Sequence, residues 1–291
     1  FGYLFNIVER GRASYDRIRN ILEEEIEIDD HAGALDHKPK GDIQFNIEDF
    51  KFTGDDRVAL HNIQFTLKQG ETLGIVGKTG SGKTAILKLL MREFEGYRGT
   101  IMYGDHSIVA YKKRALREAI GYVPQDHFLF STTVAGNIAF ANADATMDEI
   151  YEAARLANIH EDILQFTDGY NTIVGERGVS LSGGQKQRIS IARALMMKPE
   201  LLILDDSLSA VDARTEEAIL ESLKKSRTDE TTIITSHRLS AIAHAHQIIV
   251  MNEGTIIEKG THEELMELKG MYYEMYQLQQ LENLVEKGRD V

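Results

Sequence analysis

The chain has 291 residues, of which 42% are hydrophobic and 27% charged, a composition typical of a globular protein with one large domain or two small ones. Its formal net charge of −13 argues against a general nucleic-acid binder, which would need a basic face, so we expect no nucleic-acid partner. The absence of Cys excludes disulfides and thiolate metal sites, and no apolar run reaches the roughly 18 residues that a membrane-spanning helix needs.

The first segment predicts an amphipathic helix, because apolar residues recur every three or four positions over Leu4–Leu22. An acidic run, Glu23–Asp30, and a polar stretch with Gly and Pro, His31–Gly41, follow it and indicate a linker. We therefore interpret residues 1–41 as a helical extension plus linker. Because the chain opens on Phe1 rather than Met, we expect it to be part of something longer.

A phosphate-binding loop is the most informative early feature. Two alternating apolar runs, Ile43–Ile47 and Leu60–Leu67, predict a hairpin-like pair of strands that leads to it. A further strand-like run, Thr72–Val76, precedes the pattern G-x-x-x-x-G-K-[ST], and a helix-like run, Ala85–Met91, follows. The pattern comprises Gly77, Lys78, Thr79, Gly80, Ser81, Gly82, Lys83 and Thr84.

This strand–loop–helix context predicts a nucleotide phosphate site. Glycines let the backbone close around an anion with several N–H groups pointing inward, and the helix presents its positive end to the same charge. We expect Lys83 to reach the β- and γ-phosphates and the Thr84 hydroxyl to hold Mg²⁺. The loop alone does not specify the reaction that follows.

The remaining elements predict an α/β fold. Strand-like runs at Gly99–Asp105 and Ile120–Val123 precede a mostly helical block over about residues 126–197. Three continuous apolar runs then read as buried parallel strands, with a helix, Ala213–Ser226, between the first two. These runs are Leu201–Leu204, Thr231–Thr235 and Ile248–Met251. Such an alternation implies a parallel sheet with helices on both faces, followed by a helical tail over residues 271–291.

Two further pieces of chemistry accompany the loop. Asp205 closes the run Leu201–Leu204, where a nucleoside triphosphatase needs a carboxylate to organise Mg²⁺. Ser182 and Gln185 stand at capping-box spacing, and Gly183 and Gly184 between them let a ligand approach the first N–H groups of a helix. That pattern predicts a second anion-binding helix end.

The order of these motifs resembles the nucleotide-binding domain of ATP-binding cassette (ABC) proteins over nearly all of residues 43–270. The resemblance implies a P-loop NTPase (RecA-like) parallel-sheet core over residues 42–270, with an antiparallel β subdomain and a helical subdomain. It also implies ATPase activity with ATP and Mg²⁺ as cofactors. The segment Leu181–Gln185 would then be the family's signature.

The resemblance assigns roles to four more positions. Gln125 matches the Q-loop glutamine, which contacts Mg²⁺ or the attacking water, and His237 matches the switch histidine, which touches the γ-phosphate. Ser209–Asp212 matches the D-loop, which crosses to a partner subunit. Phe52 occupies the position on which adenine stacks, usually a Tyr; the alternative is a core aromatic.

Two features resemble exporters within this family. Val174–Gly178 looks like the loop that meets the intracellular loops of an exporter's membrane domain. The helix Asn6–Leu22 is similar to the cytosolic end of the last transmembrane helix in exporters that fuse both domains. Transmembrane domains would then be partners, at the cytoplasmic face of the cell membrane. Packing of this helix on its own ATPase domain remains the alternative.

Asp206 departs from the family pattern, in which Glu usually polarises the attacking water. One methylene shortens the reach by roughly 1.5 Å, against a general-base window of about 2.6 to 3.2 Å. We therefore expect the chain's own site to bind ATP and to hydrolyse it weakly.

ABC domains dimerise head to tail, so each ATP lies between one chain's phosphate loop and the other's signature. The combination of Asp206 with an intact signature resembles one half of a heterodimeric multidrug-type exporter. Ser182, Gly184 and Gln185 would complete the active site of a different chain that keeps Glu. A homodimer that tolerates Asp206 stays open.

Two other functions share parts of this pattern. A soluble ABC ATPase of translation or DNA repair would share the phosphate loop, the signature and His237, but the exporter-like loop, the first helix and the acidic charge disfavour it. A phosphoryl-transferring kinase would use the same loop but has no need for a second glycine-rich helix start.

Overall fold

The computed structural model describes residues 2–23, 28–175 and 180–289. The strands are β1 (Ile43–Phe50), β2 (Leu60–Leu67), β3 (Thr72–Gly77), β4 (Arg98–Tyr103), β5 (His106–Ser107), β6 (Ile120–Val123), β7 (Thr132–Thr133), β8 (Ile173–Val174), β9 (Leu201–Asp205), β10 (Thr231–Thr235), β11 (Gln247–Asn252) and β12 (Thr255–Gly260). The α-helices are α1 (Gly2–Leu22), α2 (Lys83–Leu90), α3 (Lys113–Glu118), α4 (Val134–Ile138), α5 (Met147–Leu156), α6 (His160–Leu164), α7 (Gly183–Met196), α8 (Ala213–Ser226), α9 (His262–Leu268) and α10 (Met271–Arg289).

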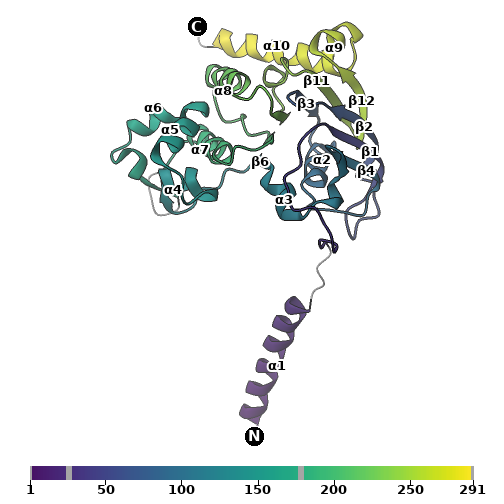
Figure 1. Cartoon of the computed structure of the whole chain (residues 1–291), viewed down its shortest axis with the longest axis vertical. Helices are drawn as coiled ribbons and strands as arrows, with labels where there is room; N and C mark the ends of the chain where they lie inside the picture. The colour runs from purple at the N-terminus through teal and green to yellow at the C-terminus, as the bar shows by residue number, and fades with distance from the viewer. Residues whose placement is uncertain (1, 24–27, 176–179, 290–291) are drawn as a thin grey trace.

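A six-stranded sheet of order β12-β11-β3-β10-β9-β6 forms the centre of the molecule (Figure 1). Five of its strands pair in parallel, and β12 joins the edge as the antiparallel arm of the β11–β12 hairpin. The predicted parallel strands are confirmed, and β10 coincides with the predicted run Thr231–Thr235. All residues of β9 and β10 are buried, as expected for parallel strands covered on both faces.

Alternate residues of each central strand enter two separate cores. Leu202 and Leu204 pack with α7 and α8 on one face of the sheet. Leu201 and Ile203 pack on the other face, with α2 and the antiparallel sheet. This separation follows from the two-residue period of a strand, which directs successive side chains to opposite faces. The prediction of helices on both faces is confirmed.

The second sheet has the order β2-β1-β4-β5 and is antiparallel. The predicted hairpin-like pair is confirmed, since Ile43 opposes Leu67 across β1 and β2. The stacked rings of Phe45 and Phe65, with centroids 4.7 Å apart, face the core that this sheet shares with α2. The antiparallel β subdomain therefore packs against the sheet that carries the phosphate loop.

A helical block, α4 to α7, lies to one side of the central sheet (Figure 1). Helix α5 starts with a capping box: the Thr146 side chain accepts a hydrogen bond from the Glu149 N–H, and the Glu149 carboxylate accepts one from the Thr146 N–H. The short antiparallel pair β7–β8 was not predicted from the sequence. Two-residue strands carry too little periodicity to be distinguished from a loop.

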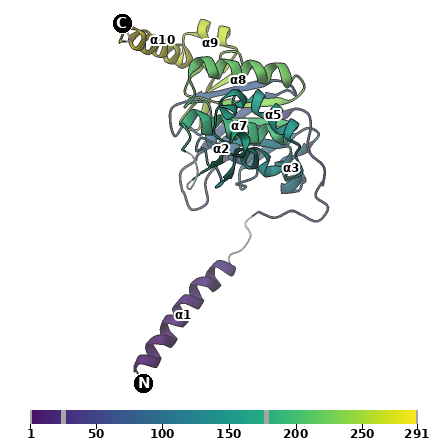
Figure 2. The ribbon, with the colours of Figure 1, turned by 90° about the vertical axis from the view of Figure 1, so that its left-hand side faces the viewer.

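The predicted first helix is present as α1, which stands apart from the rest of the chain (Figures 1 and 2). Across its described length none of its residues is buried, and large apolar side chains such as Phe5 and Ile18 are more than half exposed. Within the described ranges, no helix combines the length and the apolar character needed to cross a membrane. The apolar face of α1 is thus uncovered.

The topology of the central sheet places the residues of the candidate site at one edge of that sheet. Strands β3, β6, β9 and β10 run parallel, so their carboxyl ends lie at the same edge of the sheet. The phosphate loop follows β3, and Gln125 lies two residues beyond β6. Asp206 follows β9, and His237 lies two residues beyond β10. Ligands of open parallel sheets bind at this edge.

Candidate functional site

The phosphate loop leaves β3 at Gly77, where the backbone passes close to another strand. A Cβ on Gly77 would lie 2.2 Å from the Met251 carbonyl oxygen, so no larger residue fits. Gly82 has a φ of 103° and is the N-cap of α2 without a side-chain cap, which leaves the first N–H groups of the helix available to an anion. Lys78, Thr79 and Gly80 form the exposed crest of the loop.

Two side chains show that the loop is prepared for a ligand. The Ser81 hydroxyl is buried and has no hydrogen-bond partner within the described part of the chain. The Lys83 ammonium is buried and donates to the carbonyl oxygens of Gly77, at 2.8 Å, and Lys78, at 3.1 Å. An unsatisfied buried hydroxyl and a folded-back cation both fit a site that closes around phosphate oxygens.

The electrostatics of Lys83 connect the loop to β9. Burial lowers the pKa of the Lys83 ammonium below its ordinary value, and the carboxylates of Asp206 and Asp205 act in the opposite direction. The ammonium therefore belongs to a local charge cluster with both carboxylates. A bound polyphosphate would favour its charged form further.

Asp205 is held in one orientation by three hydroxyl groups. The hydroxyl of Thr235 donates to its Oδ1 at 2.6 Å. Its Oδ2 accepts from the hydroxyl of Tyr122 at 3.0 Å and from that of Thr84 at 3.4 Å. The sequence analysis missed Tyr122, whose pKa is raised by burial and by the Asp205 charge. Nothing in a strand-like pattern indicates that one of its side chains reaches a neighbouring strand's carboxylate.

The pairing of Thr84 and Asp205 fits a magnesium site. Both offer hard oxygen ligands, which Mg²⁺ prefers. Among the described residues, no group of three or more His, Cys, Asp or Glu side chains could hold a metal ion. Mg²⁺ commonly binds through one or two protein oxygens together with substrate phosphates. The donor set therefore suits a metal that arrives with a nucleotide.

Asp206 lies within the same cluster. It is 9% exposed and has a φ of 47°, and its N–H donates to the Thr235 carbonyl oxygen at 3.0 Å. Its Oδ2 accepts from the Gln125 side-chain amide and its Oδ1 from the His237 N–H, both at 3.4 Å. The carboxylate thus links the segments that follow β6, β9 and β10.

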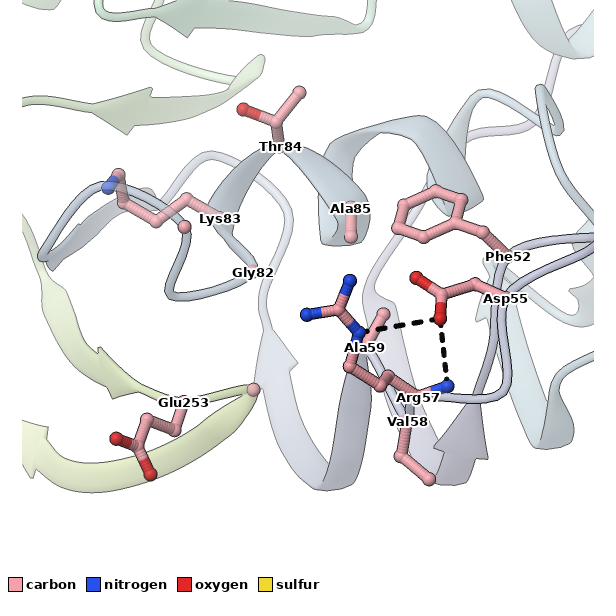
Figure 3. A pocket seen from close by; sticks show the side chains of 12 residues that line it. Phe52, Asp55, Arg57, Val58, Ala59, Gly82, Lys83, Thr84, Ala85 and Glu253 are labelled. Atoms are coloured by element: carbon pink, nitrogen blue, oxygen red, sulfur yellow. Dashed lines mark hydrogen bonds and ion pairs between the residues drawn. The ribbon is translucent and has the colours of Figure 1, made fainter.

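A cavity of about 680 Å³ joins Phe52 to the phosphate loop (Figure 3). Gly80, Lys83 and Thr84 line it on one side. Phe52 packs edge-on against Phe50 and Phe94 and is partly buried, so its ring is supported from behind. The structure therefore brings a supported aromatic ring and the phosphate-binding residues into one cavity, whose volume lies within the roughly 300–1,000 Å³ range of small-molecule sites.

Arg57 also lines this cavity, which sequence reasoning did not anticipate. Asp55 accepts a hydrogen bond from the Arg57 N–H at 2.9 Å, and its carboxylate lies 3.5 Å from the guanidinium (Figure 3). The guanidinium itself is exposed. A single charged residue in a predicted turn does not indicate that its side chain lines a cavity.

The signature has the predicted capping box. The Ser182 side chain accepts from the Gln185 N–H at 3.2 Å, and the Gln185 side chain accepts from the Ser182 N–H at 3.1 Å. A Cβ on Gly184 would lie 3.0 Å from the Ala210 carbonyl oxygen, so the helix start packs tightly on the D-loop.

The structure does not bring the signature to the phosphate loop. Ser182, Gly183, Gly184 and Gln185 are absent from the lining of the cavity, as far as the described residues go. The phosphate loop, Asp205, Asp206, Gln125 and His237 instead lie at the carboxyl ends of β3, β6, β9 and β10. The Glu176–Gly178 part of the exporter-like loop lies outside the described residues, so that prediction stays untested.

Comparison with known proteins gives a consistent result. A family model described as "ABC transporter" matches residues 60–209. The chain is 48% identical over 287 residues to the "Probable multidrug resistance ABC transporter ATP-binding/permease protein YheI" of Bacillus subtilis, covering 99% of this chain and 49% of that protein. It is 48% identical over 280 residues to the "Multidrug resistance-like ATP-binding protein MdlA" of Escherichia coli, covering 96% of this chain and 47% of that protein.

A solved structure agrees with the fold. The structure of a bacterial Atm1-family ABC exporter with ATP bound superposes with a TM-score of 0.88 at 35% identity, covering 96% of this chain and 49% of that chain. The chain therefore spans about half the length of the relatives it matches.

Proposed function

This chain belongs to the ABC transporter family as an ATPase domain, and we propose that it binds and hydrolyses ATP to drive a membrane exporter. The observation that carries the proposal is the single cavity in which Phe52 and Lys83 lie together, beside the carboxylate pair Asp205–Asp206. A base-stacking ring, a phosphate loop and a metal-organising carboxylate are the parts that ATP hydrolysis requires.

The relatives favour an exporter over a soluble ATPase. One of them is named an ATP-binding/permease protein, and another is an exporter with ATP bound. We propose that this chain likewise works with transmembrane domains at the cytoplasmic face of the cell membrane. The exposed apolar face of α1 supports this, because an uncovered amphipathic helix needs a partner surface.

We assign the nucleotide contacts by position. Phe52 would stack on adenine, and the loop from Gly77 to Thr84 would enclose the phosphates with Lys83 as the cation. Thr84, Gln125 and Asp205 would hold Mg²⁺, which would neutralise phosphate charge. His237, exposed at the end of β10, would contact the γ-phosphate.

We propose a head-to-tail dimer, because the signature lies outside the chain's own nucleotide cavity. Ser182 and Gly184 would then bind the ATP held by another chain's phosphate loop. The N-terminus of α7 suits this role, since the helix is 14 residues long and starts with N–H groups that can face an anion.

The chain's own site would hydrolyse slowly. Asp206 supplies a carboxylate that is one methylene shorter than the family's Glu, and it already accepts hydrogen bonds from Gln125 and His237. We propose that ATP at this site holds the dimer closed while faster chemistry occurs at the partner's site. The partner would be a second ABC domain that keeps Glu.

The test compares ATPase turnover of this chain alone, of the complete transporter, and of both with Asp206→Asn. We expect low activity alone, higher activity in the assembly, and little effect of Asp206→Asn on the assembly. Brisk turnover of the chain alone that Asp206→Asn abolishes would contradict the slow-site proposal. Failure of the assembly to couple ATP to movement of any substrate in sealed vesicles would contradict the exporter.

A further inference from the structure

The C-terminal helix α10 reaches the segment that carries His237 through one side chain. The Gln279 amide accepts a hydrogen bond from the Leu239 N–H at 2.9 Å and donates one to the His237 carbonyl oxygen at 2.5 Å. A carboxamide offers both a donor and an acceptor, and this one uses both on backbone groups two residues apart. Gln279 thus holds the backbone of residues 237–239 at both ends through hydrogen bonds.

The same backbone segment is also hydrogen-bonded to Asp206. The His237 N–H donates to Asp206 at 3.4 Å, so the His237 residue is held by Asp206 on one side and by Gln279 on the other. The next residue, Arg238, donates to the Val211 carbonyl oxygen at 2.7 Å and pairs with the buried Glu216 at 3.4 Å. These contacts fix the backbone, while the His237 side chain is exposed.

The attachment of α10 does not depend on Gln279. Tyr272 is fully buried at the start of the helix, its N–H is bound by the Glu258 carboxylate at 3.0 Å, and its hydroxyl lies 2.8 Å from His262. Gln279 lies seven residues further along, on a partly exposed stretch of the helix. Loss of its two hydrogen bonds should therefore leave α10 folded and docked.

We propose that Gln279 is a positioning residue that fixes the His237–Leu239 backbone. The His237 imidazole is thereby placed to contact the γ-phosphate. ATP hydrolysis then depends on how α10 is docked. This inference rests on the proposed role of His237 in ATP hydrolysis. Gln279 would touch neither nucleotide nor metal, and its effect would appear in turnover rather than in ATP affinity.

The test uses the complete transporter in the Asp206→Glu background, so that hydrolysis at this chain's own phosphate loop contributes to turnover. Gln279→Ala and Gln279→Glu are compared with Gln280→Ala, an exposed glutamine on the same helix. We expect the first two to slow hydrolysis at this chain's phosphate loop about threefold to tenfold, as the loss of one or two hydrogen bonds permits. Because the partner's site supplies about half of the turnover in this background, kcat of the complete transporter should fall by about a third to a half. ATP affinity and the unfolding temperature should stay unchanged, and Gln280→Ala should behave as the parent.

A double-mutant cycle separates positioning from a general structural effect. In the His237→Ala background, Gln279→Ala should have no further effect on kcat, because the side chain it positions is gone. A kcat of Gln279→Ala equal to that of the parent, an equal loss in Gln280→Ala, or an undiminished loss in the His237→Ala background would each overturn the inference. Unchanged turnover in His237→Ala alone would instead remove the proposed role of His237 itself.

Discussion

The side-chain amide of Gln125 donates a hydrogen bond to the carboxylate of Asp206 at 3.4 Å. The two residues follow different strands of the central sheet, and Gln125 also begins the segment that leads into the helical block. A movement of the helical block would therefore change the position of the Asp206 carboxylate, which faces the attacking water in our proposal.

Lys83→Ala should weaken ATP binding by about tenfold to a hundredfold, the range for loss of a charge-assisted hydrogen bond. The reason is that the buried Lys83 ammonium is the loop's inward-facing cation. Lys78→Ala is the matched control, because Lys78 lies on the exposed crest of the same loop. Titration with a fluorescent ATP analogue measures both, and equal losses would argue against the assignment.

Phe52→Ala should weaken nucleotide binding by about fivefold to a hundredfold, the range for lost base–aromatic stacking. Phe52→Tyr should keep the affinity, since it retains the ring. Both variants need a thermal unfolding control, because Phe52 also packs on Phe50 and Phe94. An affinity loss in Phe52→Tyr equal to that in Phe52→Ala would indicate that the ring only fills the core.

Ser182→Asp should abolish most turnover of the complete transporter without changing ATP binding to this chain alone. Asp is a good N-cap, so α7 should keep its start, while the added negative charge would repel a phosphate bound there. Thr146→Asp is the matched control, since Thr146 is the N-cap of α5 in the same kind of capping box. Similar losses of turnover in both variants would exclude a specific phosphate contact at Ser182.

Glu149→Gln should reduce the sensitivity of the fold to acid. Hydrogen bonds from the Thr146 N–H and side chain lower the pKa of the Glu149 carboxyl below its ordinary value. A carboxyl with a lowered pKa stabilises the fold above its unfolded-state pKa, and that contribution is lost as the pH falls through the folded-state pKa. Gln keeps the capping box without a charge.

Thermal unfolding of wild type and Glu149→Gln between pH 7 and pH 3.5 measures this difference. The unfolding temperature of the variant should fall less than that of wild type as the pH decreases. Parallel curves over the whole range would show that the capping carboxylate does not couple protonation to folding.

The sequence predicted the regular elements well where pattern and chemistry agreed. β6, β10 and α8 have the predicted bounds, and the predicted capping box at Ser182 is present. These features are local: a cap or an apolar run is decided by residues close together in the chain.

The contacts that orient the site could not be predicted in this way. Tyr122 on Asp205 and Gln279 on the His237 carbonyl oxygen join residues 83 and 42 positions apart. Such contacts depend on how strands and helices are placed in space, and no local period encodes them. The roles of Gln125 and His237 likewise came from a resemblance rather than from their surroundings in the sequence.

The central claim is that the short carboxylate of Asp206 limits hydrolysis at this chain's own phosphate loop. The most direct measurement is the ATPase turnover of the complete transporter with Asp206→Glu, at saturating ATP, beside wild type. We expect turnover to rise about twofold, because a second site joins the one that already works. Unchanged or lower turnover with unaltered ATP affinity would contradict the claim.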